Sequence, residues 1–258
     1  MVITTELDRR GYKLKEFEYL SGVNSTQRSY LVVSKDLQRS KPLHLILFFG
    51  GNAMTGFDAI MWFLDIRPYI ENSTRQYGFL AVDYPGYGDS EGDPSPGTIV
   101  ESVKNAVEKA IGHLSEAYDL KPADAVIIGH SLGSAVATTW LASDPPTDLS
   151  IRTLVLSAPF TSVADMASHM FGLPRIISWL VSRHNWDNTR ALQLLRDSDV
   201  VNGKIYVIHG TEDEIVPYHM GTALSKVGEP KTHLVTLKNY MHNNILDSYK
   251  VYAYAISE

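Results

Sequence analysis

The sequence contains no cysteine among its 258 residues. This absence excludes a disulfide framework, thiolate metal sites, a cysteine nucleophile and S-acylation of the chain. The sequence also lacks an excess of basic residues. It has 23 Lys and Arg against 29 Asp and Glu, which gives a formal net charge of −6, and no long basic run occurs. Nucleic acid is therefore not an expected partner.

Long hydrophobic runs are also missing. No stretch approaches the roughly 18 consecutive apolar residues of a membrane-spanning helix, and residues 1–10 lack the apolar core of a secretory signal. We therefore expect a cytoplasmic chain without a stable membrane anchor, which meets any lipid in solution, at a transient membrane contact or through a partner.

The hydrophobic fraction of 44% and charged fraction of 20% are typical of globular chains. The length suits one domain spanning 1–258.

Short apolar runs alternate with helical patterns along the chain. A helix is predicted over 98–118, where apolar residues recur at spacings of three and four, and an antiparallel hairpin is predicted from 14–19 and 29–33 around the polar turn at Gly22. The alternation predicts an α/β fold, a mostly parallel sheet with helices on both faces. The runs expected as buried strands are 43–49, 79–82, 125–128, 153–156, 205–208 and 233–237.

The segment 160–203 is too long for an ordinary connection between two strands. Its apolar residues predict a small helical cap inserted into the domain, with an acyl-binding role for Met166, Met170, Phe171 and Trp179. The same spacing is equally expected of helices that build the cap's own small core.

The segment Gly129-His-Ser-Leu-Gly133 fits the pattern G-x-S-x-G. An apolar run precedes it and a helical pattern follows, which is the strand–turn–helix setting in which Ser131 is exposed as a nucleophile. Glycine is needed on both sides of the serine because the tight reversal brings those two positions together.

A serine hydroxyl needs a base and an orienting carboxylate. In elbow hydrolases the chain order is Ser, then Asp or Glu, then His, each after a strand. Asp213 and His242 follow the last two predicted strands and fill these roles. Glu212 and Glu214 flank Asp213 and are alternative acids. Other histidines are expected to be structural or at the surface, namely His130, His209, His219 and His233.

The oxyanion of an acyl-transfer intermediate needs hydrogen-bond donors. In an elbow fold one donor is the amide after the nucleophile, here Leu132. The other is expected from the loop at Gly50-Gly51, with the Asn52 amide as the candidate; a plain turn is the alternative. The turn-rich loop that begins at Asp83 is expected to be architectural. No metal-ligating motif is found, and no cofactor is expected.

These motifs resemble the α/β-hydrolase superfamily from about residue 14 to the end. Gly50-Gly-Asn-Ala, Asp83-Tyr-Pro-Gly-Tyr-Gly-Asp-Ser, the serine elbow and His209-Gly-Thr-Glu-Asp carry the resemblance. It implies a Ser131, Asp213, His242 triad with Asn52 and Leu132 as oxyanion donors. Asn52-Ala53 and the segment 157–162 resemble most the branch of monoacylglycerol and lysophospholipid lipases and protein depalmitoylases. Many relatives have His-Gly where this chain has Gly50-Gly51, so a histidine that supports the loop is absent.

The expected function is that of a serine hydrolase of carboxylic acyl esters or thioesters, with a small lipid-like or acyl-protein substrate such as a monoacylglycerol, a lysophospholipid or an acylated protein. A serine peptidase of the prolyl-oligopeptidase type shares the elbow and the triad order and is one alternative. A ligand-binding protein on a hydrolase scaffold is another, although such proteins commonly lose a triad member.

Overall fold

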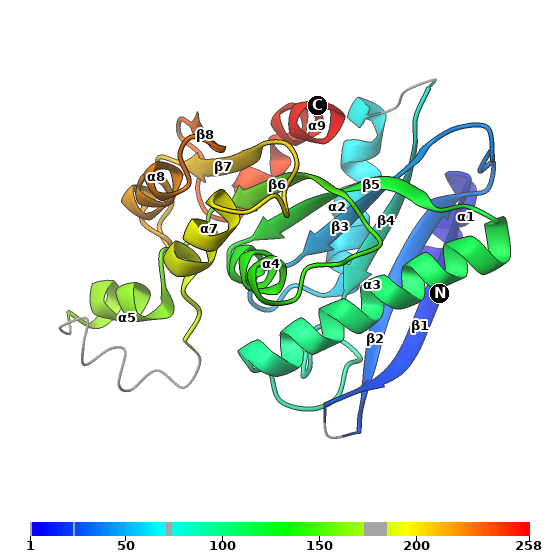
Figure 1. Cartoon of the computed structure of the whole chain (residues 1–258), viewed down its shortest axis with the longest axis horizontal. Helices are drawn as coiled ribbons and strands as arrows, with labels where there is room; N and C mark the ends of the chain where they lie inside the picture. The colour runs from blue at the N-terminus through cyan, green and yellow to red at the C-terminus, as the bar shows by residue number, and fades with distance from the viewer. Residues whose placement is uncertain (1, 23, 71–73, 173–184) are drawn as a thin grey trace.

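The structure is a computed structural model that describes residues 2–22, 24–70, 74–172 and 185–258 (Figure 1). Its described strands form one eight-stranded sheet in the order β1-β2-β4-β3-β5-β6-β7-β8. β1 pairs antiparallel with β2, β2 pairs antiparallel with β4, and the remaining pairs are parallel. The strand bounds are Tyr12–Ser21 (β1), Ser25–Ser34 (β2), Leu43–Phe49 (β3), Gln76–Val82 (β4), Pro122–His130 (β5), Ile151–Ser157 (β6), Ile205–Gly210 (β7) and Thr232–Leu237 (β8).

This sheet confirms the predicted α/β class and the antiparallel hairpin at its edge. Every predicted apolar run forms a strand, and β3 has the predicted bounds, with all its residues buried as expected for a strand covered on both faces. β4 and β5 each begin three residues before the apolar run. Their polar starts still belong to the ladder because Gln76 and Pro122 both pair with Leu43 of β3.

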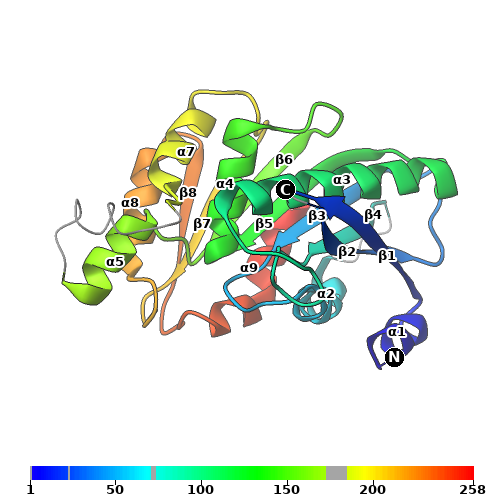
Figure 2. The same ribbon diagram turned by 90° about the horizontal axis from the view of Figure 1, so that it is seen from below.

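Helices cover both faces of the sheet (Figure 2). One core contains buried residues of α3 (Pro96–Tyr118), α4 (Leu132–Ser143), α7 (Asn188–Arg196) and α8 (Tyr218–Val227), and the other contains those of α1 (Val2–Arg9), α2 (Gly56–Ile70) and α9 (Tyr249–Ser257). In the parts of the chain that the structure describes, no helix combines the length and apolarity needed to cross a bilayer.

The predicted helix over 98–118 is α3, which begins slightly earlier because of its capping residues. The Ser95 side chain accepts a hydrogen bond from the Thr98 amide, and the Thr98 hydroxyl accepts one from the Ser95 amide. This reciprocal cap satisfies two amides at the helix start. Pro96 suits the first helical position because it has no N–H to satisfy.

Two described helices lie within the segment 160–203. α5 (Val163–Phe171) projects at one end of the molecule, and α7 packs back onto α4 (Figure 1). The buried Asn188 fixes the base of this segment, since its amide donates to Phe160 O at 2.7 Å and its oxygen accepts from the Thr138 hydroxyl at 2.6 Å. Residues 173–184, including the predicted acyl-binding Trp179, lie outside the described residues.

Candidate active site

Ser131 sits at the turn between β5 and α4. Its backbone has φ 51° and ψ −113°, in the left-handed half of φ that a serine rarely adopts. The flanking glycines explain how the turn closes. A Cβ on Gly129 would lie 2.3 Å from the Gly133 carbonyl oxygen, and one on Gly133 would lie 1.9 Å from Phe49 O. The strand, the strained serine and the helix form the elbow that the motif predicts.

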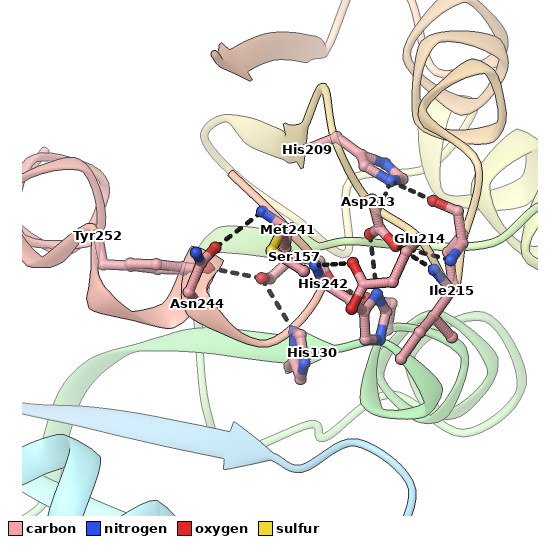
Figure 3. Close-up of polar contacts among 12 residues, drawn as sticks. His130, Ser157, His209, Asp213, Glu214, Ile215, Met241, His242, Asn244 and Tyr252 are labelled. Atoms are coloured by element: carbon pink, nitrogen blue, oxygen red, sulfur yellow. Dashed lines mark hydrogen bonds and ion pairs between the residues drawn. The ribbon is translucent and has the colours of Figure 1, made fainter. Parts of the chain in front are cut away.

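Asp213 and His242 are brought together by the loops that follow β7 and β8. His242 Nδ1 and Asp213 Oδ2 are 2.8 Å apart, and both side chains are buried (Figure 3). The Ile215 and Val216 amides donate to Asp213 Oδ1 at 3.0 and 2.7 Å. A carboxylate held this way orients the imidazole and stabilises its protonated form.

Burial alone raises the pKa of Asp213, but hydrogen bonds from His209, His242 and the Val216 amide outweigh it and hold that pKa well below its ordinary value. Asp213 is therefore ionised at neutral pH. His242 Nδ1 then carries the proton, because the nitrogen faces a carboxylate, and Nε2 is left as the basic nitrogen.

Ser131 is linked to this pair through its neighbour in the chain. The ring of His130, the residue before it, contacts the His242 ring with centroids 5.0 Å apart. Among the described residues, Ser131 Oγ makes no hydrogen bond to His242. In ligand-free active sites the nucleophile–base contact is often long and tightens only when substrate binds. The arrangement thus brings Asp213 and His242 into direct contact and Ser131 into their vicinity.

The two expected oxyanion donors flank Ser131. Leu132 is the first residue of α4, so its amide has no acceptor within the helix. The loop carrying Asn52 passes directly against Ser131, since a Cβ on Gly51 would lie 3.4 Å from Ser131 Cβ. Asn52 and Leu132 both line one cavity together with Ser131.

This cavity has a volume of about 410 Å³ and is mostly apolar. No Asp, Glu, Lys, Arg or His is among its described lining residues. The predicted cap residue Met166 lines it, whereas Met170 and Phe171 are 65% and 69% exposed and lie outside the lining. The lining comprises Asn52, Tyr87, Pro94, Ser95, Ile99, Ser131, Leu132, Phe160, Val163, Met166, Trp186, Ile215 and Val216.

Sequence reasoning named His209 as structural or at the surface and Glu214 as an alternative acid, but it missed the contacts that both make with the Asp213–His242 pair. His209 is fully buried, and its Nε2 lies 3.2 Å from Asp213 Oδ2 and 3.0 Å from Val216 O. The carboxylate of Glu214 accepts a hydrogen bond from the His242 amide at 3.1 Å (Figure 3). The four-residue spacing of His209 and Asp213 was the available signal for the first contact. The described residues hold no group of three or more His, Asp or Glu side chains arranged for a metal ion.

A second missed feature is a polar chain beneath the elbow. His130 Nδ1 lies 3.2 Å from Ser157 Oγ, which lies 2.5 Å from the Tyr252 hydroxyl (Figure 3). All three residues are buried and come from β5, β6 and α9. Burial and the neighbouring His242 lower the pKa of His130 to about 3, so its ring is neutral at ordinary pH. Nothing in the spacing of these residues along the chain pointed to this contact.

Relatives among curated proteins include a lipase and proteins named by their fold. The chain is 26% identical to the lysophosphatidylserine lipase ABHD12 of Xenopus tropicalis over 201 residues, 74% of this chain and 48% of that protein. It is 29% identical to the alpha/beta hydrolase domain-containing protein WAV2 of Arabidopsis thaliana over 175 residues, 62% of this chain and 53% of that protein. The chain thus spans about half the length of these relatives. The first match fits the lysophospholipid lipase branch that the motifs resemble.

Solved structures share the fold at low identity. An esterase of Pyrococcus furiosus superposes with a TM-score of 0.66 at 15% identity, covering 98% of this chain and 91% of that one. An acylaminoacyl peptidase gives 0.68 at 12% identity, covering 96% of this chain but only 42% of that chain. The model of the alpha/beta hydrolase family matches residues 46–253, which include the serine elbow and the loops that carry Asp213 and His242. This chain therefore belongs to the alpha/beta hydrolase family.

Proposed function

We propose that this protein is a serine hydrolase that cleaves carboxylic esters or thioesters of lipid-like acyl groups. The observation that carries the proposal is the 2.8 Å contact between Asp213 and His242 together with a strained serine that lines an apolar cavity of about 410 Å³. Monoacylglycerols, lysophospholipids and acylated proteins are the substrate classes that this cavity and the lipase relative support.

In the proposed reaction, His242 Nε2 takes the proton of Ser131 Oγ as the oxygen attacks the acyl carbonyl carbon. The resulting oxyanion accepts hydrogen bonds from the Asn52 and Leu132 amides. His242 then gives the proton to the departing alcohol or thiol, and the acyl group remains on Ser131. Water, deprotonated by His242, attacks the carbonyl carbon of this acyl-enzyme; the bond between the acyl carbon and Ser131 Oγ then breaks, His242 returns the proton to Oγ, and the carboxylic acid is released. Asp213 stays ionised and stabilises the imidazolium.

The cavity lining argues for an acyl substrate over a peptide. A peptidase of the prolyl-oligopeptidase type usually has an accessory domain or an acidic grip on the peptide amine, and no carboxylate lines the described part of this cavity. Transfer of an uncharged alkyl chain from water into this apolar cavity costs no desolvation of a polar group, whereas an ammonium group would lose its water without gaining a hydrogen-bond or charge partner.

Reaction with a fluorophosphonate tests the nucleophile, because labelling requires an activated serine. We expect label on Ser131 and none on the nearby Ser134, whose hydroxyl donates to the Gly129 carbonyl at 2.7 Å. Ser131→Ala should abolish both labelling and ester hydrolysis while the circular dichroism spectrum is retained. Appreciable turnover by a folded Ser131→Ala protein would refute the proposal.

A panel of acyl esters, acyl thioesters, lysolipids and aminoacyl amides tests the substrate class. We expect hydrolysis of the acyl esters or thioesters, with kcat/KM rising as the acyl chain lengthens, and no turnover of the amides. Preferred cleavage of the aminoacyl amides would favour the peptidase instead.

A further inference from the structure

The loop at residues 50–54 has a shape that needs outside support. It closes through a hydrogen bond from the Met54 amide to Gly51 O at 3.2 Å, with Ala53 in the third position of the turn at φ 64°. Glycine or asparagine usually occupies a turn position with positive φ, because a Cβ is strained there. Asn52 and Ala53 are also exposed. An exposed, strained turn does not by itself hold the Asn52 amide in one orientation.

The side chain that many relatives place in this loop has no room here. A Cβ on Gly50 would lie 2.9 Å from Met54 Cβ, and the Met54 sulfur accepts a hydrogen bond from the Gly51 amide at 3.2 Å. Met54 thus occupies the space beside Gly50. Support for the loop has to come from another part of the chain.

Two tyrosines of the loop after β4 provide it. The buried Tyr84 donates its hydroxyl hydrogen bond to Gly50 O at 3.0 Å, and Tyr87 donates to Asn52 Oδ1 at 2.6 Å. Their rings meet edge to face with centroids 5.5 Å apart, so each ring restrains the other. Burial raises the pKa of both hydroxyls, which therefore remain protonated donors.

We propose that Tyr84 and Tyr87 are positioning residues that hold the 50–54 loop in its oxyanion-binding shape. Tyr84 fixes the start of the loop and Tyr87 fixes its tip, where the Asn52 amide is the candidate donor. Donors at an oxyanion site stabilise the transition state only if they are oriented before the charge develops. The inference rests on the proposed hydrolase function, and it assigns a role to a loop that the sequence predicts to be merely architectural.

The test compares Tyr87→Phe, Asn52→Ala and the double variant in ester hydrolysis. Asn52→Ala keeps the backbone amide and removes only the acceptor of the Tyr87 hydroxyl. Each single variant should lower kcat about tenfold, the effect of losing one hydrogen bond that orients a donor, and leave KM within about twofold. The double variant should lose no more than Tyr87→Phe alone, because that variant already removes the contact that Asn52→Ala removes. Additive losses would overturn the inference.

Tyr19→Phe is the matched control. Tyr19 is also buried and its hydroxyl donates to Ser102 O at 3.1 Å, but it lies in β1, outside the cavity lining. Removing the Tyr19 hydroxyl should leave kcat unchanged. Affinity for a boronic acid, which mimics the tetrahedral intermediate, should fall in Tyr87→Phe by the same factor as kcat. Tyr84→Phe should act in the same direction, and if that protein does not fold, Tyr87→Phe carries the test.

Amide hydrogen exchange across residues 50–54 separates this inference from the hydrolase proposal. Exchange should be faster in Tyr87→Phe and Asn52→Ala than in the wild type or Tyr19→Phe. Unchanged exchange overturns the positioning role, whatever the activity. A wild-type protein that neither hydrolyses acyl esters nor reacts with a fluorophosphonate overturns the proposed function, while the exchange result still decides whether the tyrosines hold the loop.

Discussion

Replacing His130 by Asn should remove a large part of the acid sensitivity of folding. His130 is 2% exposed, and burial first and the nearby His242 second lower its pKa from 6.5 to about 3. The unfolded chain therefore binds this proton at a higher pH than the folded one. The stability that the neutral ring contributes is complete above pH 6.5 and is lost as the pH falls from there toward 3.

The size of this loss follows from the shift in pKa. One pKa unit corresponds to about 1.4 kcal/mol, so acidification to about pH 5 should cost about 2 kcal/mol and acidification to pH 3 about 5 kcal/mol. A loss of about 2 kcal/mol is a substantial share of the roughly 5–15 kcal/mol by which a typical domain is stable. The measurement is best confined to about pH 5 and above, where most carboxylates remain ionised.

Denaturant unfolding of the wild type and His130→Asn at about pH 7.5, 6 and 5 measures the effect. Asparagine is chosen because its side-chain amide can replace Nδ1, which lies 3.2 Å from Ser157 Oγ. Changes in packing shift the free energy of unfolding equally at every pH, so only the pH-dependent difference is read. That difference should change by about 2 kcal/mol between about pH 7.5 and 5. Parallel curves would show that His130 is not the titrating group.

Three further changes have definite expected results. Asp213→Asn should lower kcat by about 10⁴-fold, because one amide oxygen cannot accept hydrogen bonds from both the imidazole and the backbone donors. The control Glu212→Gln, at an exposed position, should retain activity. An equal loss of activity in Glu212→Gln would show that Asp213 is not the residue that orients His242. Gly133→Ala should destabilise the protein by more than about 4 kcal/mol in denaturant unfolding, since its Cβ would lie 1.9 Å from a backbone oxygen. Gly112→Ala in α3 has open space around it and should stabilise the protein by up to about 1 kcal/mol. Similar effects at both glycines would contradict the elbow geometry. Met166→Ala should lower kcat/KM for long acyl esters by about tenfold and spare acetyl esters, and an equal loss for both would show that the side chain does not contact the acyl chain.

The strands and the main helix were predictable because their signals are local. A strand covered on both faces needs an unbroken apolar run, which is what residues 43–49 provide. The helix predicted over 98–118 is α3, whose start two residues earlier depends on Ser95, Pro96 and Thr98, all within four consecutive residues. The polar starts of β4 and β5 were missed because their pairing depends on the neighbouring strand, which no local pattern records.

The candidate site likewise has features that local sequence motifs predict and contacts that they do not. The elbow glycines and the loops holding Asp213 and His242 follow from local motifs and chain order. The carboxylate of Glu214 on the His242 amide, and the hydroxyl of Tyr87 on Asn52, join loops that lie far apart in the sequence. Their residue types are common in turns, so nothing marks them as contacts before the chain is folded.

By itself, the sequence determined the order of the strands, the helix over 98–118, the tight serine turn and the loops that carry Asp213 and His242. Each of these depends on backbone conformation and apolar spacing within a few residues. Only the tertiary structure decided that Asp213 faces His242, that His130 is buried against it, and that Tyr84 and Tyr87 hold the loop beside Ser131. These are contacts between loops at one edge of a parallel sheet, and the twist and packing of the whole sheet set the distances between such loops.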